Sequence, residues 1–503
     1  MNSPERPRGP PDATECRKLH RRRRANRVQP PPGVIEPKTP KTPKPSECAF
    51  YPWKLAPQAC SRAASGCILR NERASRTVIR PRRDRTPDDL CAPHHPASAL
   101  SVFEEVRTLT ATPSAGAALR RRLADALHDT GDIRTPAWRE AVEAVPRELF
   151  VPEWFERTDT DTGTLWTPLT GEDATLEEVY ADTTLVTQLD GTTRPADATG
   201  PMYGAPSSSS TLPSLVVGML EDLRVEPDDD VLEIGTGTGY STALLCRRLG
   251  SSKVTSIEVD PDTAHRAAAA LKEAGYRPHL ITGDGLDGAP DRAPFHRIIA
   301  TRAVRTLPAA WLAQARTGAV ILAILTGRLY AYGQARITAL GSGEAVGEFL
   351  PGTISFMTAR RHAAGPIDQR AALAATGDGR PTSLGPDILT DWTGRFVVQG
   401  ALPTATHMTA SVGDSPTLDH LIAADGSYAT LLRQYDGTWR VREGGPTRLW
   451  EHAERAVAAW RNAGSPTTDR FRLRISPAAQ SVHLPDTDLS WNLPAEPFAP
   501  TAG

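Results

Sequence analysis

Hydrophobic and polar positions alternate along this chain in two different rhythms. From Val231, short apolar runs appear at regular intervals, namely VLEIGTG, KVTSIEVD, HLITGDG, FHRIIAT and AVILAIL. Between them lie STALLCRRLG, PDTAHRAAAALKEAGY and LPAAWLAQARTG, in which the apolar residues have helical spacing. Strands that alternate with helices predict an α/β fold with a doubly wound, mostly parallel sheet.

Two further helices are expected ahead of this region. Leu119 and Leu127 lie on one face of a helical pattern that stops near Gly131. Pro136 suits the first turn of a second helix, which carries Trp138. Together with the alternating region, these helices predict one domain over residues 114–360.

The rhythm changes after about residue 359. GRFVVQG, SYATLLRQYDGTWRVRE and DRFRLRISPAAQSVHL alternate with period two around one helix, Arg448–Trp460, and Asp436-Gly437 suits a tight hairpin. This pattern predicts a separate antiparallel α+β domain over 386–503, which would serve as an accessory, peptide-binding domain. The tryptophans of this stretch, which form either its core or a peptide-binding surface, are Trp439, Trp450, Trp460 and Trp491.

The charge is distributed unevenly. The 503 residues have a formal net charge of −1, but residues 1–96 hold 21 basic and 9 acidic side chains, together with 17 of the 45 prolines. Proline fixes φ and removes a backbone donor, so neither helix nor sheet can extend far in such a segment. Residues 1–100 are therefore predicted to be a disordered basic head.

Three other interpretations of the head remain open. Arg21–Arg24 could contact nucleic acid, although no folded element or interleaved aromatic residue supports that contact. Cys91, His94 and His95 have side chains that bind zinc, but no second pair completes four ligands. Translation could also begin near Leu100. We expect neither nucleic acid nor a metal ion as a partner.

Composition excludes several classes of protein. No run of about 18 apolar residues occurs, so no membrane span is expected. The first residues lack the apolar segment of a secretory signal. Five of the six cysteines lie in the head, which leaves Cys246 alone in the body. A folded body without cysteine pairs fits a reducing compartment, so a cytoplasmic location is predicted.

The sharpest local signal is a glycine-rich turn. The apolar run Val231–Ile234 leads into Gly235-Thr236-Gly237-Thr238-Gly239 and then into a helix. Glycines let a backbone turn tightly and approach a ligand. The spacing is GxGxG and differs from the GxGxxG of dinucleotide-binding proteins. Glu258 ends the next strand, where a carboxylate can accept both hydroxyls of a ribose.

A third turn, Gly283-Asp284-Gly285, follows the third strand and offers a carboxylate for an adenine amino group. Turns at the carboxyl ends of consecutive parallel strands share one crevice. The alternative is that Glu258 and Asp284 only cap the helices that follow them. The three turns taken together favour a nucleoside site.

These motifs resemble an S-adenosylmethionine-dependent methyltransferase of class I, and specifically the protein-L-isoaspartate O-methyltransferase family. The matching stretch covers about 200 residues. Its motifs are VPRELFVP, Tyr180-Ala181-Asp182, Ser207–Pro213, EIGTGTGY, SIEVD, GDG, PFHRII, LPAAW and AVILAIL.

The resemblance implies a Rossmann-like sheet, the cofactor S-adenosyl-L-methionine, and a peptide or protein substrate with an aspartyl or isoaspartyl carboxylate. Thr211, Ser210 and Asp182 are the implied catalytic residues. The implied cofactor-binding residues are Glu233, Gly235, Thr236, Gly237, Gly239, Glu258, Asp284 and Gly285.

The chain departs from the family pattern at several positions. Thr211 takes the place of a serine, and Leu212 takes the place of a glutamine. His296 replaces an aspartate. Arg302 and Arg305 stand where the family has small residues, and they either grip a substrate carboxylate or lie in solvent.

The serine-rich turn, Pro308–Trp311 and the long C-terminal stretch resemble a branch that methylates an ordinary aspartate of a modified peptide, whose ester closes to an aspartimide. Tailoring of a ribosomal peptide is therefore the expected function. Isoaspartate repair is the first alternative. A non-catalytic binding protein on the same fold is the second, and the change to Leu212 supports it.

Overall fold

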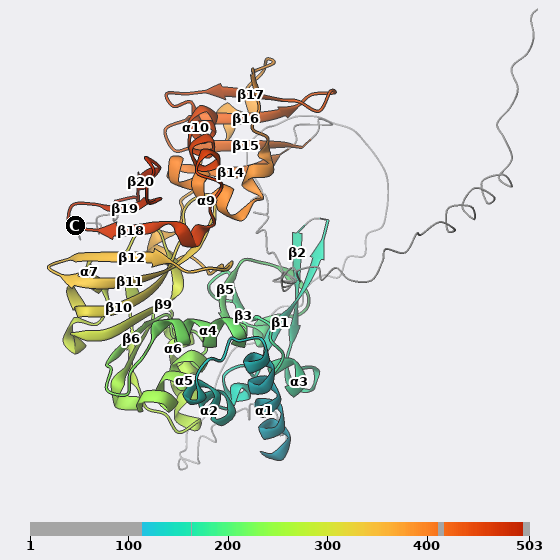
Figure 1. Cartoon of the computed structure of the whole chain (residues 1–503). Coiled ribbons are helices and arrows are strands. Elements are labelled where there is room, and N and C mark those ends of the chain that lie inside the picture. Colours follow the sequence, from blue (N-terminus) through green and yellow to red (C-terminus); the bar gives the residue numbers. More distant parts are fainter. Residues whose placement is uncertain (1–112, 162, 411–416, 496–503) are drawn as a thin grey trace, which may run out of the picture. The chain divides into compact units, whose positions relative to one another are not determined.

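The computed structural model describes residues 113–161, 163–410 and 417–495 (Figure 1). The predicted disordered head, including Cys91, His94 and His95, lies outside these ranges. Within them the strands form three sheets, one with ten strands and two with five.

The ten-stranded sheet has the order β20-β19-β18-β12-β11-β10-β9-β6-β7-β8, and the neighbours from β10 to β8 are parallel. Its parallel strands are β6 (Val231–Ile234), β7 (Val254–Glu258), β8 (His279–Thr282), β9 (Phe295–Val304) and β10 (Ala315–Leu325). All residues of β6 and β7 are buried, as expected for parallel strands that are covered on both faces. The predicted doubly wound α/β sheet is confirmed.

The order of the parallel strands reverses between β6 and β9. The chain moves outward from β6 through β7 to β8, then returns to the other side of β6 to form β9 and β10. Ligands bind at such a switch point in open α/β sheets. The helices of this part are α4 (Pro213–Leu223), α5 (Tyr240–Leu249), α6 (Pro261–Glu273) and α7 (Ala309–Gln314). The predicted N-terminal helices appear as α1 (Pro113–Asp129) and α2 (Pro136–Ala144).

A second sheet, which the sequence patterns did not indicate, lies between α2 and α4 along the chain. Its order is β4-β2-β1-β3-β5. Ser209 and Ser210 of β5 pair with Val186 and Leu185 of β3, so the serine-rich segment is an edge strand and not a free loop. The elements of this stretch are β1 (Trp154–Thr160), β2 (Gly163–Leu169), α3 (Leu176–Val179), β3 (Leu185–Leu189), β4 (Met202–Tyr203) and β5 (Pro206–Ser210).

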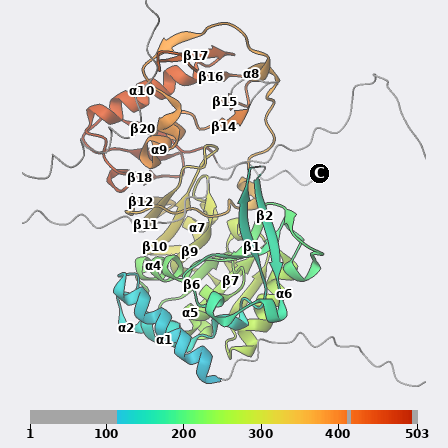
Figure 2. The ribbon, with the colours of Figure 1, turned by 90° about the vertical axis from the view of Figure 1, so that its right-hand side faces the viewer.

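The third sheet is antiparallel, with the order β13-β17-β16-β15-β14. The expected hairpin is present, since β16 and β17 pair in antiparallel fashion. Gly437 in the turn between them has the positive φ, 83°, that such a turn requires. The helices α9 and α10 lie side by side in both views (Figures 1 and 2). The elements of this part are α8 (Arg370–Ala374), β13 (Arg380–Thr382), α9 (Trp392–Ala401), β14 (Ala405–Ala410), β15 (Leu418–Ala423), β16 (Tyr428–Arg433), β17 (Trp439–Gly444) and α10 (Leu449–Asn462).

The expectation that GRFVVQG forms a strand is wrong, since these residues lie in α9. Asp391 caps that helix by accepting a hydrogen bond from the backbone NH of Gly394 at 2.5 Å. Phe396, Val397 and Val398 are all buried, so this face is held by packing that overrides the strand preference of the valines.

The last strands do not join the third sheet. The strand β18 (Arg472–Ile475) pairs with β12 (Glu344–Phe349), and β19 (Gln480–His483) and β20 (Ser490–Asn492) follow it in the ten-stranded sheet. The strand β12 itself pairs with β11 (Gly333–Gly341). The stretch 386–503 therefore contributes strands to two sheets, although its antiparallel character is as predicted.

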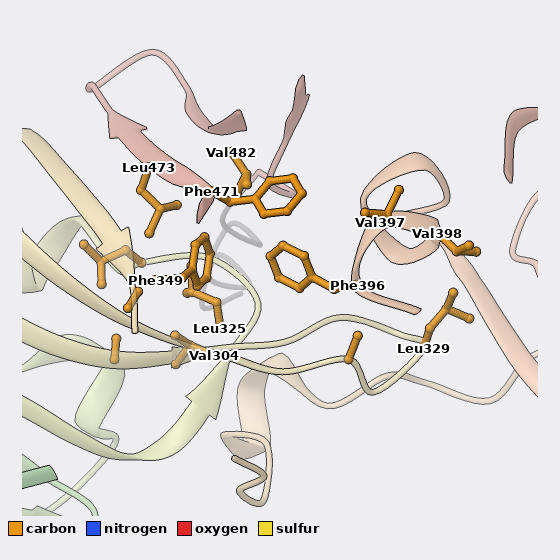
Figure 3. Close-up of a cluster of buried hydrophobic side chains, with 14 of the residues drawn as sticks. Val304, Leu325, Leu329, Phe349, Phe396, Val397, Val398, Phe471, Leu473 and Val482 are labelled. Atoms are coloured by element: carbon orange, nitrogen blue, oxygen red, sulfur yellow. The ribbon is translucent and has the colours of Figure 1, made fainter. Parts of the chain in front are cut away.

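One hydrophobic core connects these parts. Phe396 of α9 packs against Phe349, Phe471 and Trp491, with ring centroids 5.1, 5.6 and 5.5 Å away (Figure 3). Trp450 is fully buried in the same core and Trp460 is 7% exposed, while Trp439 and Trp491 pack against it. The core interpretation of the tryptophans is confirmed.

In the described ranges, the helices are too short or too polar to cross a membrane.

Replacement of Gly400 by alanine tests the contact between α9 and the last strand. A Cβ at Gly400 would lie 2.3 Å from Cδ2 of Trp491, whose ring is held by Phe396 and Phe471. We expect Gly400→Ala to lower the free energy of unfolding by about 1–3 kcal/mol. The control Gly218→Ala in α4 meets no atom within 4 Å and should raise it by up to ~1 kcal/mol. Urea unfolding of both variants measures this, and stabilisation by Gly400→Ala would contradict the packing.

Candidate functional site

The glycine-rich turn lies at the switch point, between β6 and α5. Gly235, Gly237 and Gly239 have φ values of 98°, 56° and 92°, in the region that favours glycine. The backbone NH groups of Gly235 and Thr236 donate to the carbonyl of Ile257 in β7, at 2.8 and 3.1 Å. The turn is therefore held against the neighbouring strand. Four of its residues, Gly235–Thr238, line a pocket.

Glu258 ends β7 beside this turn, and its side chain is buried at 2% exposure. Its Oε2 accepts a hydrogen bond from the backbone NH of Gly237 at 2.9 Å, and its Oε1 accepts one from the backbone NH of Asp260 at 3.1 Å. This carboxylate thus fixes the glycine turn. It also has the position at a strand end that the sequence predicted for a ribose-binding group.

Asp284 follows β8 and caps the short helix Gly285–Asp287, accepting from the backbone NH of Leu286 at 2.9 Å. The carbonyl of Gly285 accepts from Nε1 of Trp311 at 2.8 Å. A Cβ at Gly285 would lie 2.4 Å from Cγ2 of Ile234, so only glycine lets this turn pack against β6. The third predicted turn is therefore close to the first.

Glu233 occupies a different place from the one predicted. Its side chain is fully buried, and its carboxylate accepts hydrogen bonds from the hydroxyls of Ser241, Thr242 and Ser256. Burial raises the pKa of this carboxyl, and the three donors oppose that shift. The structure places Glu233 behind the glycine turn as a support. Of the predicted cofactor-binding residues, the pocket lining includes Gly235, Thr236 and Gly237 and does not include Glu233, Gly239, Glu258, Asp284 or Gly285.

The pocket beside the turn has a polar wall and an apolar wall. The polar wall comes from the backbone of Gly235–Thr238 and from Ser209, Ser210 and Thr211. The apolar wall consists of Val216, Met219, Leu220, Ile299, Phe356 and Met357. An amphipathic pocket of this kind suits a ligand that has polar ends and an apolar, water-sensitive centre.

The structure brings two of the three predicted catalytic residues to this pocket. Thr211 and Ser210 line it, and Ser210 is otherwise buried. Asp182 does not line it. Its Oδ1 accepts from the backbone NH of Ser214 at 2.8 Å, so Asp182 holds the first turn of α4. In the described structure Asp182 therefore orients the chain beside the pocket.

Arg147 was missed by the sequence analysis, although it stands inside the motif VPRELFVP. Its side chain is fully buried, and Nη1 donates to the carbonyls of Val179 and Ala181 at 2.5 and 3.1 Å. Nη2 donates to Ser210 Oγ at 3.4 Å and to the carbonyl of Thr211 at 3.3 Å. One guanidinium thus joins the polar wall to the segment before Asp182. The sequence signal for a buried role of Arg147 was its position in a motif whose other residues are mostly apolar.

Arg302 lines the pocket from the end of β9, and its Nη2 donates to the carbonyl of Ser207 at 3.2 Å. Burial lowers the pKa of this guanidinium, and the negative charge of Glu258 opposes that shift. Arg302 is half-buried, which argues against the interpretation that it only lies in solvent. Arg305 is half-buried as well, but it does not line the pocket.

A segment after β12, which the sequence patterns did not indicate, runs along the rim of the site. Ala303 at the end of β9 donates to the carbonyl of Met357 at 3.0 Å and accepts from the NH of Ala359 at 2.8 Å. Arg360 pairs with Asp260 at 3.1 Å, and Arg361 pairs with Asp284 at 3.3 Å. We call residues 354–362 the rim segment. Its two arginines neutralise carboxylates at the carboxyl ends of β7 and β8.

The comparisons with known proteins agree with the motifs. A family model described as protein-L-isoaspartate(D-aspartate) O-methyltransferase matches residues 195–332. A protein-L-isoaspartate O-methyltransferase from Ignicoccus hospitalis is 32% identical over 205 residues, which are 40% of this chain and 80% of that protein. Protein-L-isoaspartate O-methyltransferase 2 from Archaeoglobus fulgidus is 34% identical over 191 residues, 38% of this chain and 70% of that protein.

The extent of the match differs among the relatives. The chain spans 64% of the length of a protein-L-isoaspartate O-methyltransferase from Opitutus terrae, to which it is 34% identical. A solved structure titled protein-L-isoaspartate O-methyltransferase is 21% identical, with a TM-score of 0.43, and the match covers 73% of this chain and 99% of that one.

Replacement of Glu258 by glutamine tests the crevice. The amide oxygen can still accept from the backbone NH of Gly237, although the amide NH2 group cannot accept from the backbone NH of Asp260. The charge that would strengthen bonds to two ligand hydroxyls is lost. We expect the affinity for S-adenosylhomocysteine to fall about ten- to hundredfold. The control Asp262→Asn removes an exposed carboxylate of α6. Isothermal titration calorimetry measures both, and an unchanged affinity in Glu258→Gln would show that the ligand binds elsewhere.

Proposed function

The chain belongs to the protein-L-isoaspartate O-methyltransferase family, whose cofactor is S-adenosyl-L-methionine, and we propose that it methylates an aspartyl or isoaspartyl carboxylate of a peptide. The observation that carries the proposal is the pocket in which the serine and threonine residues of one segment face the glycine turn. The comparisons with known proteins confirm the family and the cofactor that the motifs predicted.

The residues at the switch point fit the cofactor. Glu258 and Asp284 are carboxylates at neighbouring strand ends, as a ribose and an adenine amino group require. Gly235 leaves no room for a side chain, because a Cβ would lie 2.6 Å from Thr301 Oγ1. When bound, S-adenosyl-L-methionine supplies an activated methyl group on a positive sulfur. The backbone of Gly235–Gly239 and these two carboxylates would hold it.

The reaction needs no general base from the chain. A peptide carboxyl group has a pKa near ~4, so it is already an anion at neutral pH. This anion, held by Thr211 and Ser210, would be the acceptor for the activated methyl group that the bound cofactor supplies. Opposite charges cancel along this path, so water that stabilises the separated charges slows it.

The chain contributes orientation and exclusion of water. Thr211 and Ser210 would bind the carboxylate through their hydroxyl groups, and Arg147 holds the backbone that carries both. The apolar wall, which includes Met219 and Phe356, keeps water from the reacting atoms. Such positioning can lower a barrier by roughly 7–11 kcal/mol.

A second candidate is the tailoring of a ribosomal peptide, in which the ester closes to an aspartimide. The third sheet and the helices α9 and α10 support it, because they lie beyond the residues that match the family model. A surface outside the family's common domain could bind a particular partner peptide. Repair of isoaspartyl residues needs no such addition, and the relatives that match this chain are named for isoaspartate.

Two synthetic peptides that differ only in one aspartyl or isoaspartyl linkage test the function. With methyl-labelled S-adenosyl-L-methionine, we expect a base-labile methyl ester on one of them, located by mass spectrometry. Transfer to the isoaspartyl peptide supports repair, and transfer to the aspartyl peptide supports tailoring. Binding of S-adenosylhomocysteine with transfer to neither, across several sequences, would favour the non-catalytic alternative and overturn the proposal.

Replacement of Thr211 by alanine tests the polar wall. Loss of one hydroxyl donor to the reacting carboxylate should lower kcat about tenfold or more, while the affinity for S-adenosylhomocysteine changes less than twofold. The control Ser214→Ala keeps the backbone bond to Asp182 and should leave kcat unchanged. A weaker cofactor affinity with normal kcat would instead place Thr211 at the cofactor.

A further inference from the structure

Three arginines border the ends of β9 and β10 and the start of α9, and two of them, Arg305 and Arg328, interact electrostatically. Arg305 directly follows β9, and Arg328 follows the end of β10, whose last residue Leu325 pairs with Val304. Arg395 lies in the first turn of α9. We call Arg305, Arg328 and Arg395 the arginine cluster.

Hydrogen bonds and apolar contacts bring α9 to these strand ends. Gln399, one turn after Arg395, donates to the carbonyl of Ala331 and accepts from its NH, both at 3.0 Å. Leu329, which follows Arg328 in sequence, lies near Val398 of α9 (Figure 3). Arg395 of the helix is thus held near the segment that follows Arg328, where its electrostatic partner is Tyr332.

The cluster has buried donors that no described residue satisfies. Nε of Arg305, Nη1 of Arg328 and Nε of Arg395 are each buried without an acceptor in the described ranges. Nε1 of Trp392, one turn before Arg395, and Nε2 of His362 are in the same condition. Within the same ranges, no carboxylate forms an ion pair with any of the three arginines. The three arginines are half-buried, but each has one nitrogen that is buried without an acceptor, which is unfavourable and makes this arrangement uncommon.

The electrostatics agree with an unneutralised group. Burial lowers the pKa of Arg305, and the positive charge of Arg328 lowers it further. Burial also lowers the pKa of Arg395, and the interaction with Tyr332 opposes this shift. The pKa of His362 is lowered to about 4, first by burial and then by Arg305. Its Nδ1 accepts from the backbone NH of Arg305 at 3.1 Å, so the neutral ring presents Nε2 as a donor.

The arginine cluster borders the pocket described above. Arg302, which lines the pocket, stands three residues before Arg305 on the same strand end. The rim segment separates the two places, since Phe356 and Met357 line the pocket and His362 contacts Arg305. The pocket and the cluster therefore share the rim segment as a common border.

We propose that the arginine cluster is a second carboxylate site, which binds an acidic side chain or the C-terminal carboxylate of the peptide whose other carboxylate is methylated. The inference rests on the proposed function and specifies its substrate class as acidic peptides. Guanidinium groups match carboxylates through paired hydrogen bonds, and an unneutralised group of them strongly favours an anion. The Trp392 and His362 donors would complete the contacts.

Fluorescence anisotropy with a fluorescein-labelled hexaglutamate peptide tests the site without any methyl transfer. The full chain should bind this probe at low salt and should bind a hexaglutamine probe at least about tenfold more weakly. Arg328→Gln and Arg395→Gln should each weaken hexaglutamate binding about tenfold. Replacement of a half-buried arginine that forms no ion pair within the described ranges should leave the melting temperature equal or higher, so loss of binding is not loss of fold.

The control variant is Arg316→Gln, which removes an exposed arginine at the opposite end of β10. It should leave hexaglutamate binding within twofold of the unmodified chain. Equal binding of both probes, or equal losses in Arg316→Gln and Arg328→Gln, would overturn the site and indicate general charge attraction.

The same variants separate this inference from the proposed function. Hexaglutamate binding that depends on the cluster, in a chain that methylates no peptide, would support the second site and count against the methyltransferase proposal. Methylation whose KM is the same for a peptide with flanking glutamates and its glutamine counterpart, in the unmodified chain and in Arg395→Gln, would overturn the second site alone.

Discussion

The buried guanidinium of Arg147 must find acceptors, because a charged group that is removed from water without them is strongly unfavourable. It finds them in the backbone carbonyls of Val179 and Ala181 on one segment and of Thr211 on another. These segments are distant in sequence, since Val179 ends α3 and Thr211 directly follows β5. One side chain thus joins α3 to the strand end that carries the hydroxyl groups of the pocket, in addition to the pairing of β5 with β3.

The parts of the site that follow strands could be predicted from the sequence, and the parts that depend on distant contacts could not. The glycine turn, Glu258 and Asp284 each follow an apolar run, and the topology of a parallel sheet gathers such positions at one edge. Glu233 lies on the same strand as the turn, but its neighbours Ser241 and Ser256 enclose it, which spacing does not reveal. The rim segment was missed because its bonds join residues about 50 or more positions apart.

The fold shows the same division. The short apolar runs predicted the parallel strands correctly. The central strands β6 and β7 are buried on both faces, so nearly all of their residues can be apolar. The period-two pattern of residues 394–400 indicated a strand. Phe396 and its neighbours instead form a helix that packs against rings of β12 and β20 and against Phe471, which directly precedes β18. Local preference was outweighed there by partners that lie up to 95 residues away along the chain, between Phe396 and Trp491.

The pairing of β18 with β12 has a consequence for biosynthesis. The edge of the large sheet beyond β12 stays open while the ribosome makes more than a hundred further residues, because its partner strand begins only at Arg472. An open edge can pair with other chains. A nascent form of this protein that has completed its nucleoside-binding half is therefore expected to need protection, such as a chaperone, until the closing strands emerge.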